Sequence, residues 1–166
     1  MDMEHVVTFS NEVIMLKFLL KMASITRAAL KALRFYKHIV QCVEKFILRS
    51  SPQLKIPGLY VIDAIVRQSK YCYQERDVYG PRFMRNLVTL FLSILQCDEK
   101  DKSMISRVLF LWQRGNVFPE DVIQALQNVV TDPENTDVIQ KGNKLSPIQY
   151  RDPHQRRCSY ISYRSV

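Results

Sequence analysis

Apolar side chains return every three or four positions from residue 8 to about residue 130, and this period constrains the fold more than any other feature. The clearest run consists of Ile25, Ala28, Ala29, Ala32, Leu33, Tyr36, Ile39, Val40, Val43 and Ile47. Glycine is scarce, with 4 residues in 166, and a strand signal occurs only briefly at 160–163. The sequence therefore predicts an all-α fold of stacked antiparallel helix hairpins, built as a bundle or a superhelix.

Prolines, glycines and short polar segments divide this pattern into helices. We expect a first helix at 9–20 and a second that opens at Ser24 or Thr26 and reaches Ile47, as one helix or as two in succession. The pairs Ser51-Pro52 and Pro57-Gly58 bracket a predicted loop.

Later boundaries are marked in the same way. A polar turn at 97–102, with Asp101 as a cap, precedes a helix that Gly115 closes, and a short helix follows at 120–130. Beyond Val130 the apolar period stops. We therefore expect one domain at 1–130 and a polar, disordered tail at 131–166.

One helix face combines side chains suited to recognition. Tyr60, Asp63 and Arg67 stand at i, i+3 and i+7, so an aromatic ring, a carboxylate and a guanidinium share one side of the helix. The opposite face is formed by Leu59, Ile62, Ile65 and Val66, which predicts a core contact. The mixed face is a candidate binding surface.

A second candidate face lies on the helix that precedes Gly115. Arg107, Leu111 and Arg114 share one side of it, and an arginine can donate two charge-assisted hydrogen bonds to a phosphate. The alternative is that the arginine stems only cover a hydrophobic edge. Trp112 stands mid-stripe and is expected in the core.

The sequence offers no motif for catalysis or for a cofactor. It has no nucleophile elbow, no phosphate-binding glycine loop and no metalloprotease helix, so neither an enzyme nor a cofactor is expected. The four cysteines form no Cys-x-x-Cys pair, which argues against zinc. Cys42 and Cys97 lie in apolar runs and are expected to be buried thiols.

The formal charge of +8 favours an anionic partner, which could be nucleic acid, a phosphorylated peptide or acidic lipid. A membrane module of the phosphoinositide-binding ENTH/VHS type is the main alternative, because Lys17, Lys21, Arg27, Lys31 and Arg34 lie close together. No amphipathic insertion helix with a lysine-rich face is evident, and the apolar stretch at 13–20 is too short to span a bilayer. No membrane association is expected.

Three ordered motifs resemble the CTD-interacting domain, and most closely that of the SR-related CTD-associated factors. They are Gly58-Leu59-Tyr60-Val61-Ile62-Asp63-x-Ile65-Val66-Arg67-Gln68-Ser69, Asp77-Val78-Tyr79-Gly80-Pro81-Arg82-Phe83 and Asp101-Lys102-Ser103-x-Ile105-x-Arg107-Val108-Leu109-x-Leu111-Trp112-Gln113. The resemblance covers about residues 6–130. It implies a right-handed superhelix of seven to eight helices whose groove binds the phosphorylated heptad repeats of the RNA polymerase II C-terminal tail.

The resemblance also implies roles for particular residues. Asp63 would hydrogen-bond the turn-forming peptide near its tyrosine, Arg107 would pair with the phosphoserine that follows, and Leu111 could line the pocket for the tyrosine ring. Tyr60 and Arg67 would lie along the same groove. The implied protein is nuclear and monomeric and acts in transcription termination and in coupling to mRNA processing. Direct binding of RNA is a separate hypothesis, which rests on the basic surface of the chain rather than on the resemblance.

The chain departs from the family pattern in three places. Ala64 stands where the family has serine, the first interhelical loop is shortened to 17–22, and an unrelated tail follows Val130. The RNA-recognition domain and Ser/Arg-rich regions of longer relatives are not in this sequence.

Overall fold

The computed structural model describes residues 20–135 of the chain, and every regular element in this part is helical. A helix at 20–31 leads through the short turn η1 (Leu33–Phe35) into α2 (Tyr36–Arg49) and α3 (Pro52–Tyr73). After η2 (Gln74–Arg76) follow α4 (Tyr79–Met84) and α5 (Leu87–Ile94). Beyond η3 (Glu99–Asp101) follow α6 (Lys102–Arg114) and α7 (Glu120–Thr131).

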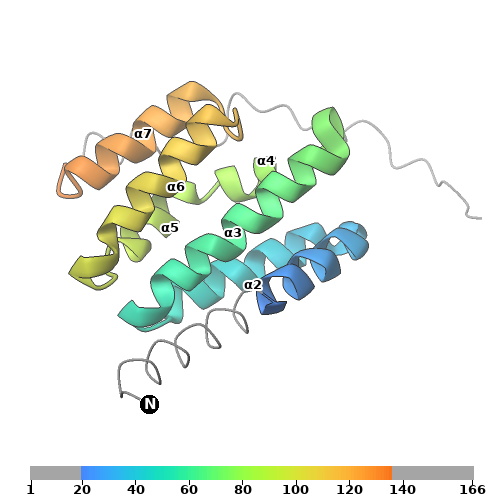
Figure 1. Cartoon of the computed structure of the whole chain (residues 1–166), viewed down its shortest axis with the longest axis horizontal. Helices are drawn as coiled ribbons and strands as arrows, with labels where there is room; N and C mark the ends of the chain where they lie inside the picture. Colours follow the sequence, from blue (N-terminus) through green and yellow to red (C-terminus); the bar gives the residue numbers. More distant parts are fainter. Residues whose placement is uncertain (1–19, 136–166) are drawn as a thin grey trace, which may run out of the picture.

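The long helix α3 organises this arrangement. It runs between the 20–31 helix and α2 on one side and α6 and α7 on the other (Figure 1). Consecutive long helices are antiparallel, as in the 20–31 helix with α2 and in α6 with α7. Seven α-helices are present within residues 20–135, and the prediction of an all-α superhelix is confirmed.

The core forms where the buried face of α3 meets α5 and α6, and α7 packs against these two helices. The apolar residues predicted for that face are all fully buried: Leu59, Ile62, Ile65 and Val66. The Trp112 ring lies 4.9 Å from the Phe118 ring and 5.9 Å from that of Phe91, centroid to centroid. Trp112 is thus a core residue, as expected from its position in the stripe.

The loop predicted between Ser51-Pro52 and Pro57-Gly58 is wrong, because α3 already begins at Pro52 and contains Pro57. Gly58 lies within α3 and packs directly against α2. A Cβ atom built on it would lie 2.6 Å from Cγ1 of Ile47, so the glycine allows α2 and α3 to approach closely.

The α2–α3 junction also buries a lysine. Lys55 is 2% exposed, and its Nζ donates to the carbonyl of Ile47 at 2.6 Å and to Oγ of Ser93 at 2.8 Å. Burial lowers the pKa of Lys55 below its usual range. These contacts stabilise a helical start that proline and glycine alone did not predict.

Three further boundaries can be compared with the sequence prediction, and the expected helix start at Ser24 or Thr26 is wrong. The helix at 20–31 is continuous through Ser24 and Thr26, and Oγ1 of Thr26 donates back to the Met22 carbonyl at 2.9 Å. The next break is at η1, which divides the long run into two helices, one of the two options left open. Asp101 takes the N-cap position of α6 but makes no side-chain cap bond.

Cys97 is buried as expected, whereas the prediction of a buried Cys42 is wrong. Cys42 lies on the exposed side of α2, because Val40 and Ile47 form the buried side of that helix. The helix expected at 9–20 lies outside the described residues except for Leu20, and so does the tail from residue 136. The proposed division into a domain and a tail stays a prediction.

Candidate functional site

The mixed face of α3 contains a carboxylate that two helices share. Asp63 is only 7% exposed, and each of its oxygens accepts one hydrogen bond. Oδ1 accepts from Nε1 of Trp112 at 2.8 Å, across 49 residues of sequence. Oδ2 accepts from Nη2 of Arg67 at 2.9 Å, one helical turn further along α3. Asp63 therefore joins α3 to α6 and orients Arg67.

Arg67 is the cation of this face and is accessible to solvent. Its side chain is 51% exposed, and the bond to Asp63 uses one of its five N–H donors. Tyr60 lies two turns earlier on the same side of α3 and is half-buried. The structure thus places the three predicted residues on one face, with Asp63 at its buried base.

Two pockets, each of about 670 Å³, meet at Arg67. The first lies between the 20–31 helix and α3 and includes Thr26, Arg27 and Ala64 in its lining. Ala64 has no side-chain atom beyond Cβ, so this position of the lining offers no hydroxyl where the family has serine. Arg27 faces Arg67 across helices in one lining, which concentrates positive charge there.

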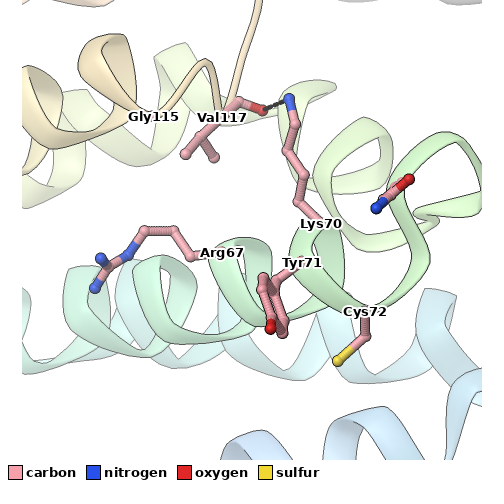
Figure 2. A pocket seen from close by; sticks show the side chains of 7 residues that line it. Arg67, Lys70, Tyr71, Cys72, Gly115 and Val117 are labelled. Atoms are coloured by element: carbon pink, nitrogen blue, oxygen red, sulfur yellow. Dashed lines mark hydrogen bonds between the residues drawn. The ribbon is translucent and has the colours of Figure 1, made fainter.

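The second pocket lies at the C-terminal end of α3, and Figure 2 shows it from close by. Arg67, Lys70 and Tyr71 project from α3, and Val117 approaches from the segment that follows α6. Nζ of Lys70 donates to the carbonyls of Asn116 and Val117, which holds this segment against α3. Tyr71 is highly exposed at the rim.

The second predicted face lies on the outside of α6. Arg107 and Arg114 are exposed, and Leu111 is partly exposed between them. Within residues 20–135, the linings of the two pockets at Arg67 contain neither Arg107 nor Leu111. Trp112 connects the two faces, since it lies in α6 and donates to Asp63.

Sequence reasoning missed several residues of this region. Lys70 and Tyr71 were not considered, Arg27 entered only through a possible membrane cluster, and the partner of Trp112 was not foreseen. The last had a usable signal, because a buried indole N–H requires an acceptor and Asp63 was the acid set among apolar residues. No group of three or more potential metal ligands occurs within residues 20–135. None of the described helices has the length and apolar character needed to cross a bilayer.

Comparison with known proteins defines the class. A family model described as CID domain matches residues 15–126, more than half of the chain, and the chain therefore belongs to the CID domain family. SR-related and CTD-associated factor 8 of Homo sapiens and of Mus musculus is 50% identical over 131 residues, which are 75% of this chain and 10% of the relative.

SR-related and CTD-associated factor 4 of Homo sapiens is 49% identical over 116 residues, which are 69% of this chain and 10% of the relative. The chain spans about a tenth of the length of these curated relatives. The resemblance stated from the three sequence motifs is confirmed.

Proposed function

We propose that the chain is a non-catalytic binding module for the phosphorylated C-terminal heptad repeats of the RNA polymerase II largest subunit. Membership of the CID domain family and the similarity to CTD-associated factors support this partner. The observation that carries the proposal is the position of Arg67, which is half-exposed, is oriented by Asp63 and borders two adjoining pockets.

In this proposal the peptide lies over the mixed face of α3 and reaches α6. Tyr60 and Arg67 contact it along α3, and Asp63 accepts a peptide hydrogen bond with its remaining lone pairs. Arg107 pairs with a phosphoserine, and Leu111 receives the ring of the heptad tyrosine. The exposed positions of Arg107 and Leu111 on α6 are compatible with these contacts.

The biological setting follows from the same family. We place the protein in the nucleus, as a monomer, in transcription termination and in the coupling of transcription to mRNA processing. No cofactor takes part in binding, because guanidinium and hydroxyl groups supply the phosphate and peptide contacts directly.

The test is a titration of the full chain with unphosphorylated, singly and doubly phosphorylated heptad peptides, followed by fluorescence anisotropy. Phosphorylated peptides are expected to bind more tightly. Arg107→Ala removes a charged hydrogen bond worth about 1.5–3 kcal/mol, so affinity for the matching phosphopeptide falls roughly tenfold or more. Arg76→Ala, at an exposed arginine of η2, is the matched control and leaves affinity unchanged.

Equal or undetectable affinity for all three peptides would contradict the proposed function. A loss in Arg107→Ala that is the same for phosphorylated and unphosphorylated peptides would assign Arg107 a structural role and remove it from the phosphate site.

A further inference from the structure

The net positive charge of the described part of the chain comes from its first two helices. Residues 20–49, which form the first helix, η1 and α2, contain seven basic residues and one acidic residue. Residues 50–135 contain ten of each and are formally neutral. The net charge of the folded body therefore comes from two consecutive helices, whereas the proposed peptide site lies mainly on α3 and α6.

The cations of this end form a continuous exposed surface. Lys37, Gln41, Lys45 and Arg49 repeat every four residues along the outer side of α2, over about 18 Å at 1.5 Å per residue. All four are exposed, because the opposite side of α2 buries Val40 and Ile47. Lys31 and Arg34, which come shortly before α2 in the sequence, are also exposed.

Among the described residues, no carboxylate forms an ion pair with a cation of this surface. The ion pairs between described residues join Arg67 to Asp63 and Lys102 to Glu99, both outside α2. The acid of this region, Glu44, is partly buried and accepts a hydrogen bond from Asn86. Within residues 20–135, the basic row is therefore available to an external anion.

An aromatic ring lies within the same surface. Phe35 is 53% exposed at the start of α2, and the guanidinium of Arg34 lies 4.7 Å from its ring centroid. An exposed phenyl ring beside cations offers a stacking platform together with phosphate contacts, the combination by which proteins hold single-stranded nucleic acid.

We propose that this surface binds single-stranded nucleic acid. We define it as the basic face: Lys31, Arg34, Phe35, Lys37, Lys45 and Arg49. Phosphates contact the cations along α2, and an unpaired base stacks on Phe35. None of these six residues lines the two pockets at Arg67, so the basic face is separate from the proposed peptide site. A module of this kind can hold a nascent transcript and a peptide at the same time.

The test compares charge-matched variants of the full chain. Lys37→Gln with Lys45→Gln removes two cations from the basic face, and Arg76→Gln with Lys100→Gln removes two exposed cations from the neutral part. Anisotropy with fluorescent oligo-U RNA and oligo-dT is measured across a salt series. Residues 136–166 contribute six further basic residues and two acidic ones, so the difference between the variants is the readout.

The salt series distinguishes lost phosphate contacts from a general change in charge. For single strands, each phosphate contact makes the slope of log K against log salt more negative by about 0.7. The basic-face variant lacks two such contacts, so its slope should be less negative than that of the wild type by about 1.4. The control pair should keep the wild-type slope. Phe35→Leu should lower affinity at least ~5-fold at fixed salt with the slope unchanged, as expected for lost stacking. Phe110→Leu, at an equally exposed ring of α6, is its control.

Three results would overturn the proposal. Equal weakening by both double variants would show that overall charge alone is responsible. Duplex RNA bound as tightly as single strands, with Phe35→Leu silent, would exclude base stacking. Binding to vesicles of anionic lipid that is lost in the basic-face variant, with no oligonucleotide binding by the wild type, would assign the surface to membranes. Unchanged heptad-peptide affinity in the basic-face variant would support two separate sites.

Discussion

Substituting Asp63 tests how the fold and the candidate site are connected. In Asp63→Ala the buried Trp112 N–H loses its acceptor, and the charged hydrogen bond disappears with it. A lost hydrogen bond to a charged group costs about 1.5–3 kcal/mol, and an unsatisfied buried donor costs a similar amount when nothing replaces its partner. We expect the free energy of unfolding to fall by about 2–3 kcal/mol.

Two other variants separate the contributions of the two oxygens. Asp63→Asn keeps an oxygen that can accept from Trp112, so the expected loss is about 1 kcal/mol. Arg67→Met breaks only a pair in which the arginine is half-exposed, and such pairs contribute about 0–1 kcal/mol. Asp63→Ala is therefore expected to destabilise the protein most, Asp63→Asn less, and Arg67→Met least.

Urea unfolding followed by tryptophan fluorescence and by helical circular dichroism measures this order. Trp112 is the chain's single tryptophan, so its emission reports directly on the α3–α6 contact. The reasoning is refuted if Arg67→Met destabilises as much as Asp63→Ala. It is also refuted if Asp63→Ala costs less than about 0.5 kcal/mol, which would be a typical effect for a surface position.

Three further predictions concern helix packing and buried polar groups. Gly58→Ala places a Cβ 2.6 Å from Ile47 and should lower the free energy of unfolding by about 1–3 kcal/mol in thermal melts, whereas an unchanged melt would show that α2 and α3 can move apart. Burial raises the pKa of Tyr79 to about 12, above about 10 in the unfolded chain, so stability should fall as pH rises from 10 to 12. In urea titrations, Tyr79→Phe should abolish this fall of stability between pH 10 and 12. Below pH 10 the variant should be less stable by about 1 kcal/mol, because the Tyr79 hydroxyl donates to the Ala29 carbonyl at 2.7 Å. An identical pH profile of stability in both proteins would contradict this prediction. Burial lowers the pKa of Lys55, so wild-type stability should rise with pH from the lowered value up to about pH 10, where the titration of Tyr79 begins to oppose the rise. Lys55→Met should lack this rise below pH 10, and a parallel rise in the variant would exclude Lys55 as the cause.

The sequence predicted the helices wherever one face is buried, because the apolar period then reports burial directly. Leu59, Ile62 and Trp112 were correctly assigned to the core on this basis. Prediction failed where a local signal had two possible meanings. Pro57-Gly58 is typical of a turn, yet here the glycine serves the close approach of α2, a contact that depends on a helix 11 residues earlier in sequence.

The same limit applies to Cys42 and to the candidate site. Cys42 was expected in the core because it lies in an apolar run, but the buried side of α2 is formed by Val40 and Ile47, and position 42 faces away from it. Spacing along α3 correctly grouped Tyr60, Asp63 and Arg67 on one face. It could not reveal the hydrogen bond between Asp63 and Trp112, because period within a helix carries no information about which residue of a distant helix lies opposite.

That bond changes how substitutions at position 63 must be interpreted. One carboxylate oxygen maintains the contact between α3 and α6, and the other orients Arg67 at the junction of the two pockets. Weaker peptide binding by Asp63→Ala would therefore follow even if the carboxylate never touched the peptide, because the two walls of the proposed site would no longer be held together. Asp63→Asn keeps an acceptor for Trp112 but replaces the oxygen that accepts from Arg67 with an amide N–H₂ group. A direct contact is therefore assigned to Asp63 only if Asp63→Asn, with Trp112 emission unchanged, still weakens peptide binding when Arg67 is already methionine.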